Sequence, residues 1–77
     1  MRKISLAHLK ADHKGRVIEI LGGGNIHKRL MSMGIFEGKE ISKLSHIGLR
    51  GPVVFKVGRS ILAVGHGVAE KIIVETE

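Results

Sequence analysis

The 77-residue chain contains no cysteine, tryptophan or tyrosine, one proline and only two phenylalanines. The absence of cysteine excludes disulfides, zinc-thiolate sites and iron-sulfur clusters, so a metal site would have to use histidine, carboxylate or methionine. Phe36 and Phe55 both lie in apolar patterns typical of a core. Proteins that bind single-stranded nucleic acid stack bases on exposed aromatic side chains. The scarcity of aromatics therefore disfavours that function.

Long hydrophobic runs are also absent. The longest apolar stretches, 61–64 and 72–74, are far shorter than the roughly 20 residues that a membrane-spanning helix needs. The N-terminal stretch begins with positive charge, but His8 and Lys10 interrupt its apolar run. A secretion signal requires an uninterrupted apolar core of about 7–15 residues. We therefore expect a cytoplasmic protein.

The composition is that of a small folded domain, with 43% hydrophobic and 26% charged residues. A chain of this length buries only about 60% of the surface that its unfolded form exposes, which leaves little room for a deep catalytic cleft. No serine nucleophile is paired with a histidine in the sequence, and the acidic residues are few and scattered. We predict a single non-enzymatic domain over residues 1–77.

Basic residues exceed acidic ones by thirteen to seven, which gives a formal net charge of +6. An acidic protein surface, a membrane face or a nucleic acid could each attract such a chain. The basic residues are spread along the sequence instead of forming one stripe. This spread disfavours nucleic acid as the partner, because a nucleic-acid footprint is a clustered basic patch.

Five short segments have the composition or alternation of β-strands, namely 16–21, 39–46, 53–57, 60–64 and 72–74. The alternation in 39–46 breaks at Lys43 and Leu44, which predicts a β-bulge. Residues 4–11 and 65–71 are expected to form short helical turns. Five strands of this length favour a closed or nearly closed barrel, because closure protects the strand edges.

The segment LGGGNIHKRLMSMG, residues 21–34, predicts a short helix after three glycines. Ile26, Leu30 and Met33 share one helical face, with Asn25 expected as the N-cap and Gly34 as the left-handed residue after the C-terminus. The glycines lack the Gly-Lys-Ser/Thr ending of a phosphate-binding loop. Their tolerance of positive φ instead suits a sharp reversal from strand to helix.

Lys28 and Arg29 lie on the polar face of this helix. If both are near its start, the helix dipole disfavours them, so their placement suggests contact with an acidic partner. His27 and Met31 flank the pair, and we include all four residues in the predicted partner-binding site. The alternative is a solvated polar face, which is the commoner role of adjacent basic residues.

The order of motifs resembles the FeoA-like family of bacterial and archaeal ferrous iron uptake. The resemblance rests on GRVIEI, RLMSMGIFEGKEI, GPVVFKV, ILAVG and VAEKIIV, and its most specific residues are Leu30 and Met33-Gly34 followed by Gly38 and Ile41. Lys43 departs from the family pattern, in which an apolar residue is more common. The resemblance implies a mainly β fold, a small SH3-like β-barrel of about five strands with one short α-helix inserted after the first strand.

The family also implies a function. Its members are thought to assist the membrane ferrous iron permease, whose cytoplasmic part carries a GTP-binding domain, so we expect a small cytoplasmic accessory or regulatory protein that acts by contact with this permease. The same fold occurs as a terminal domain of iron-dependent repressors. The alternative is therefore a metal-responsive regulatory or nucleic-acid-binding β-barrel module.

No set of metal ligands stands out in the sequence. None of the five histidines has another histidine three or four positions away. His27 has Met31 at i+4, but a thioether is a poor iron ligand, and His66 lies between two glycines. His27 and His66 are therefore only candidate ligands of a low-affinity site for Fe²⁺ or another divalent transition metal ion.

Self-association is a further expectation, because a core this small gains from apolar contacts between chains. The LSHIGLRGP loop, residues 44–52, and the strand edges could supply these contacts. We therefore expect a homo-oligomer at high concentration.

Overall fold

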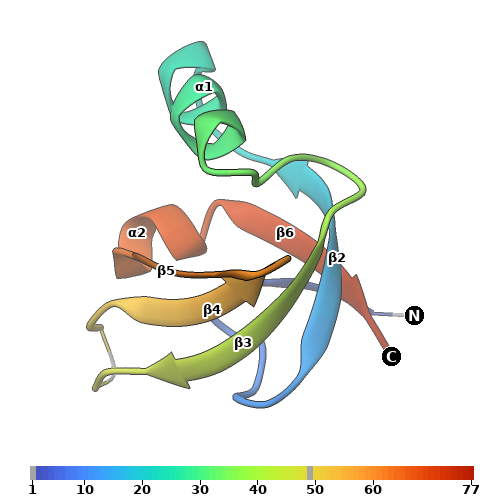
Figure 1. The fold of residues 1–77 in the computed structure, drawn as a ribbon, viewed down its shortest axis with the longest axis vertical. Helices are drawn as coiled ribbons and strands as arrows, with labels where there is room; N and C mark the ends of the chain where they lie inside the picture. Colours follow the sequence, from blue (N-terminus) through green and yellow to red (C-terminus); the bar gives the residue numbers. More distant parts are fainter. Residues whose placement is uncertain (1, 49) are drawn as a thin grey trace.

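One six-stranded antiparallel sheet and two short helices form the protein in this computed structural model, which describes residues 2–48 and 50–77 (Figure 1). The order of the strands in the sheet is β1-β6-β2-β3-β4-β5. The elements along the chain are β1 (Arg2–Ser5), β2 (Lys14–Ile20), α1 (Gly24–Ser32), β3 (Glu40–His46), β4 (Val53–Val57), β5 (Ser60–Val64), α2 (His66–Ala69) and β6 (Ile72–Thr76).

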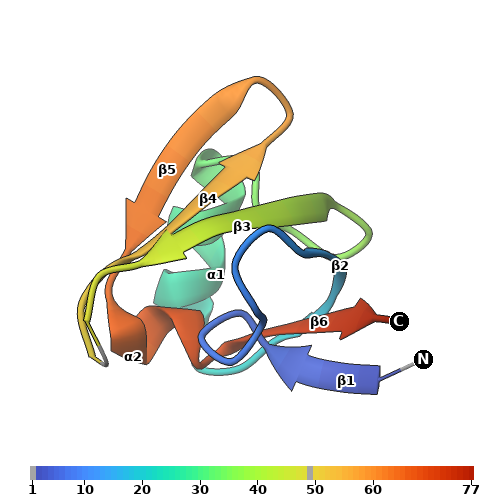
Figure 2. The ribbon, with the colours of Figure 1, turned by 90° about the horizontal axis from the view of Figure 1, so that it is seen from below.

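The sheet curls around the core without closing. Strands β1 and β5 are its two edges, and Figure 2 shows them on opposite sides of the molecule. The mainly β, SH3-like prediction is confirmed, whereas full closure of the barrel is not observed. In the part of the chain that the structure describes, no helix is long and apolar enough to cross a membrane.

Strand β1 was not expected from the sequence. Residues 4–11 were predicted to form a helical turn, but Arg2–Ser5 pairs with the C-terminal strand β6, from Arg2 opposite Thr76 to Ser5 opposite Ile73. This pairing joins residues that are far apart in the sequence. A pattern among neighbouring residues therefore could not predict it. The helix α1 consequently follows the second strand instead of the first, and the structure has six strands instead of five.

Fifteen buried apolar residues form one core inside the curled sheet. The alternation predicted for β4 is confirmed, since Val53, Phe55 and Val57 point inward while Lys56 is exposed. The core consists of Leu6, Ala7, Leu9, Val17, Ile20, Leu30, Ile35, Ile41, Val53, Phe55, Val57, Val64, Ala69, Ile72 and Val74.

The predicted bulge in β3 is confirmed by a shift in register against β4 between Lys43 and Ser45. Lys43 lies before the shift and points inward with Ile41, two residues earlier, so it is only 3% exposed, whereas Leu44 lies at the surface. The Nζ of Lys43 donates a hydrogen bond to the Ala7 carbonyl at 2.9 Å. Burial of the ammonium lowers the pKa of Lys43. The lysine thus fastens β3 to the turn that follows β1.

The glycine run has a structural role in the turn from β2 to α1. Gly22 has a φ of 105°, and a Cβ at this position would lie 3.0 Å from the side chain of Ile26. The helix begins at Gly24 with Gly23 as its N-cap, and no side chain caps it. The prediction of Asn25 as the N-cap was therefore wrong, because the glycines allow the helix to start earlier than the apolar stripe suggests.

The helix α1 ends where the sequence predicted, just before Gly34. Gly34 has a φ of 85°, and its N–H donates to the Met31 carbonyl at 3.0 Å. The N–H of buried Ile35 donates to the Leu30 carbonyl at 2.8 Å. This pair of hydrogen bonds is a Schellman motif, which satisfies the free carbonyls of the last turn.

Phe36 departs from the expectation of a core position, since 41% of the residue is exposed. The Lys39 Nζ lies 5.9 Å from the centroid of its ring. Phe36 directly follows the Schellman motif, and it is Ile35 instead that fills the core at this point. The expectation that Phe55 is buried is confirmed.

Candidate interaction surface and histidine pair

The helix α1 stands above the curled sheet (Figure 1), and the polar residues on its outer face are exposed. Leu30 is buried, and Ile26 and Met33 pack half-buried against the core, as predicted. Lys28 and Arg29 are exposed, and Met31 is 62% exposed. These three predicted partner-binding residues therefore share an accessible helix.

The dipole argument for Lys28 and Arg29 was wrong. Because the helix begins at Gly24, Lys28 lies beyond its first turn, and Arg29 belongs to its last turn. A cation near a helix C-terminus is favoured by the dipole. The position of Lys28 and Arg29 is therefore compatible with a stable helix and does not by itself imply a partner. A role in partner contact is supported instead by their exposure and by the groove next to Arg29.

His27 has a structural role. Its Nε2 donates a hydrogen bond of 2.7 Å to the carbonyl of Ile20, the last residue of β2. The imidazole is half-buried and ties the first half of α1 to the strand. Met31 lies on the exposed side of the helix. The bond of Nε2 to a carbonyl makes His27 a poor metal-ligand candidate through that nitrogen.

A small apolar groove of about 150 Å³ lies between α1 and the segment that joins β5 to α2. Most of its wall is aliphatic, and Arg29 contributes the only charged side chain among its lining residues. The groove is lined by Ile26, Arg29, Leu30, Met33, Ala63, Val64, Gly65 and Val68. We use the name α1 face for this groove together with the exposed residues Lys28, Arg29 and Met31. Arg29 links the two, because it is exposed and lines the groove, whereas Lys28 and Met31 are not among the lining residues.

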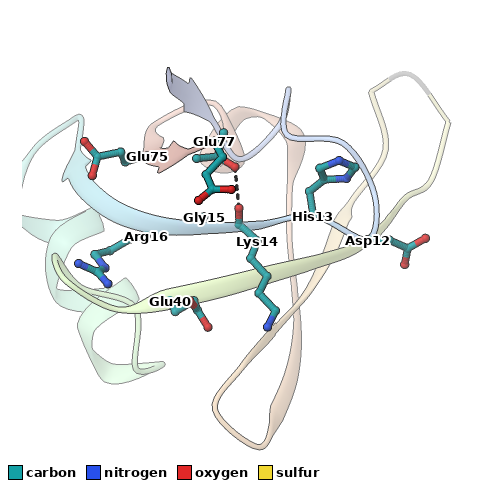
Figure 3. Close-up of a pocket in the computed structure, with 9 residues that line it drawn as sticks. Asp12, His13, Lys14, Gly15, Arg16, Glu40, Glu75 and Glu77 are labelled. Atoms are coloured by element: carbon teal, nitrogen blue, oxygen red, sulfur yellow. Dashed lines mark hydrogen bonds between the residues drawn. The ribbon is translucent and has the colours of Figure 1, made fainter. Parts of the chain in front are cut away.

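A cavity of about 560 Å³ lies where the start of β2 meets the C-terminal residues (Figure 3). Arg16 and Glu40 are opposite one another on β2 and β3, and Thr76 Oγ1 donates to the Lys14 carbonyl at 2.8 Å. Its lining residues are Asp12, His13, Lys14, Gly15, Arg16, Glu40, Glu75, Thr76 and Glu77. Because acids and bases alternate on its walls, the cavity presents no single sign of charge.

His46 and His66 meet although they are 20 residues apart in the sequence. His46 ends β3 and His66 begins α2, and the His66 Nδ1 lies 3.2 Å from the His46 Nε2. The other nitrogen of His66, Nε2, lies 3.6 Å from the Glu70 Oε2. From the sequence, only histidines close to one another could be recognised as a pair, so His66 was predicted as a candidate ligand and His46 was missed. Across residues 2–48 and 50–77, no group of three or more His, Asp or Glu side chains is placed to hold a metal ion.

The loop expected to promote self-association lies partly outside the described residues, because it includes Leu49. In its described part, Ile47 is 61% exposed. Self-association stays a prediction.

The curled antiparallel sheet, with one helix inserted after β2 and a short one before β6, places the chain in the class of small SH3-like β domains. The model of the FeoA domain matches residues 4–76, which is nearly the whole sequence. The chain therefore belongs to the FeoA family, which is associated with ferrous iron transport.

Solved structures agree with this assignment. The chain is similar to a crystal structure of an iron uptake regulatory protein, FeoA, with 32% identity, a TM-score of 0.90 and full coverage of both chains. It is also similar to a FeoA-like protein from Clostridium acetobutylicum, with 25% identity, a TM-score of 0.85 and coverage of 99% of this chain and 88% of that one. No curated protein matches the chain.

A manganese-dependent transcriptional repressor shares the fold, with 17% identity and a TM-score of 0.88. The match covers 97% of this chain and 42% of the repressor. FeoA from Stenotrophomonas maltophilia, solved in complex with zinc, shares it at 21% identity with a TM-score of 0.79, over 94% of this chain and 89% of that one.

Proposed function

We propose that this chain is a non-enzymatic accessory protein of ferrous iron uptake that acts in the cytoplasm by binding the cytoplasmic GTP-binding part of a membrane ferrous iron permease. Membership of the FeoA family supports the process. The single observation that supports binding of a protein is the α1 face, where exposed Arg29 lines an apolar groove.

The α1 face has the two features that a protein partner can use. Its groove offers apolar walls from α1, β5 and α2, and such walls bind a protruding side chain by excluding water. The charge of Arg29 favours a partner surface that carries acidic residues, because complementary charge speeds association. The partner-binding site predicted from the sequence comprises Lys28, Arg29, His27 and Met31, and we include the groove next to Arg29 in this proposal.

A substitution at the groove tests this proposal. Ala63 is exposed, lies on β5 and lines the groove, so Ala63→Glu places a carboxylate among its apolar walls. We expect this variant to bind the purified cytoplasmic domain of the permease at least about tenfold more weakly, measured by titration calorimetry, because the carboxylate would fill the apolar groove, neutralise Arg29 and repel an acidic partner surface. Ser60→Glu is the matched control, since Ser60 is exposed on the same strand and is not among the groove residues.

The second candidate function is a metal-responsive regulatory or nucleic-acid-binding module, and it is favoured by the shared fold of the manganese-dependent repressor. Affinity for duplex and single-stranded DNA in moderate salt, measured beside affinity for the permease domain, separates the two. Tight salt-sensitive binding to DNA without binding to the permease domain would refute the accessory function. Binding to the permease domain that Ala63→Glu leaves unchanged would retain the function and reject the α1 face as its site.

A further inference from the structure

We propose that His46 and His66 together bind a divalent transition metal ion, with Glu70 as the residue that positions the His66 ring. The proposal goes beyond the contact with a permease, because it concerns binding of a metal ion by residues that do not line the groove, and it needs no protein partner. It is based on the juxtaposition of two imidazoles from β3 and α2 and of one carboxylate from the end of α2.

The spacing of the two nitrogens fits a shared ion. Two nitrogens bound to one tetrahedral Zn²⁺ at 2.0–2.1 Å lie about 3.3 Å apart. The His66 Nδ1 and the His46 Nε2 are 3.2 Å apart, and the planes of the two rings differ by 23°. In this structure the contact is a hydrogen bond between two stacked rings, and its length matches the separation that one shared ion requires. Binding would replace the shared hydrogen by the ion and would need the rings to turn so that both lone pairs point toward it.

Glu70 favours the form of His66 that binds a metal. A neutral imidazole carries its hydrogen on one nitrogen and a lone pair on the other. The Glu70 carboxylate lies 3.6 Å from the Nε2 of His66, so it favours a hydrogen there and leaves the lone pair on Nδ1, toward His46. Metal-binding histidines commonly donate their second N–H to a carboxylate. At 3.6 Å the Glu70 carboxylate is beyond hydrogen-bond distance in this structure, and it is placed to accept this N–H once the ring turns.

The site is accessible and leaves room for further ligands. The His66 side chain is 23% exposed and that of Glu70 is 51% exposed. Gly65 and Gly67 flank His66, and a Cβ at either position would meet no atom within 4 Å. Two protein nitrogens leave the other coordination positions to water or to a partner. Imidazole ligands select Zn²⁺, Fe²⁺, Ni²⁺ or Cu²⁺ over Mg²⁺ and Ca²⁺.

Titration of the full chain with Zn²⁺, followed by calorimetry, tests the site. We expect one ion per chain, with binding lost in both His46→Gln and His66→Gln and weakened about tenfold in Glu70→Gln, as is typical when the carboxylate that orients a ligand is removed. His13→Gln is the matched control, because His13 is exposed and lines the mixed-charge cavity with four acidic residues, where an ion could otherwise bind. Unchanged affinity in both histidine variants, or its loss in the control, would overturn the proposal.

Imidazole ¹⁵N chemical shifts of the unsubstituted chain give a second measurement that does not depend on the folding of any variant. Zn²⁺ should shift the resonances of His46 and His66 and leave those of His8 and His13 in place. Shifts confined to His8 or His13 would contradict the site. Since both experiments use the isolated chain, failure to bind a permease would not alter either result.

Discussion

The interior wall formed by β3 and β4 and the α1 face contain similar residue types but use them in opposite ways. In the wall, Phe55 is fully buried and Lys43 is almost so, with its Nζ held by the Ala7 carbonyl. Along α1, Lys28 and Arg29 are in solvent, and Phe36, just after the helix, is 41% exposed. The position of a lysine or phenylalanine in the fold, and not its type, therefore decides whether it supports stability or is free to contact a partner.

Substitution of the two phenylalanines tests this contrast, and it has the largest expected effect on the free energy of unfolding. We expect Phe55→Ala to lower the free energy of unfolding by about 3–5 kcal/mol, because it removes a buried ring and leaves a cavity. Phe36→Ala should change it by less than about 1 kcal/mol, since the side chain is partly in solvent. Urea unfolding followed by circular dichroism measures both. Similar losses in the two variants would show that Phe36 is as important to the core as Phe55.

The buried lysine gives the next effect. Lys43→Met keeps an unbranched side chain in the wall but leaves the Ala7 carbonyl without its donor, so we expect a loss of about 1 kcal/mol at neutral pH. Lys56→Met on β4 is the control, because Lys56 is exposed and Lys43 is not. This control should change the free energy of unfolding by less than about 0.5 kcal/mol.

The pH dependence sharpens the same comparison. Burial lowers the pKa of Lys43 below its ordinary value of 10.5, so between the two values the unfolded chain binds a proton that the folded chain does not. The free energy of unfolding contributed by this group therefore rises with pH across that window. Denaturation at several pH values should show this rise in the unsubstituted chain and in Lys56→Met, and its absence in Lys43→Met. An identical pH profile in all three would contradict the burial of the ammonium.

Much of this fold could be predicted from local patterns. The alternation of Val53 and Phe55 identified β4, the broken alternation at Lys43 identified the bulge, and Gly34 identified the end of α1, because each depends on neighbouring residues. Strand β1 escaped prediction, since its only partner is β6, from the other end of the sequence.

The candidate sites could be predicted only in part, for the same reason. Exposure of Lys28 and Arg29 followed from the helical period, but the groove beside them also requires β5 and α2, which approach only in the folded chain. The partner of His66 was missed because His46 is 20 residues away in the sequence. The two histidines meet only in the folded chain, where the end of β3 lies next to the start of α2. His27 looked like a ligand in sequence, yet its Nε2 donates to a backbone carbonyl.

The double charge reversal Lys28→Glu with Arg29→Glu should have the smallest effect on stability. It distinguishes the α1 face from the interior wall directly, because it should change partner binding and leave the core intact. An acid at position 29, in the last turn of α1, opposes the helix dipole, so we expect a loss below about 1 kcal/mol in the free energy of unfolding. If the α1 face meets an acidic surface, the same change should weaken binding to the permease domain and slow association most at low salt, because it replaces attraction by repulsion. Lys10→Glu with Lys14→Glu is the control, since both lysines are exposed outside the α1 face and the net charge changes equally. The test measures association rates at two salt concentrations together with the melting temperature of each variant. Equal slowing of association in both double variants would assign the effect to net charge. Unchanged association in both would show that Lys28 and Arg29 are only a solvated face of the helix.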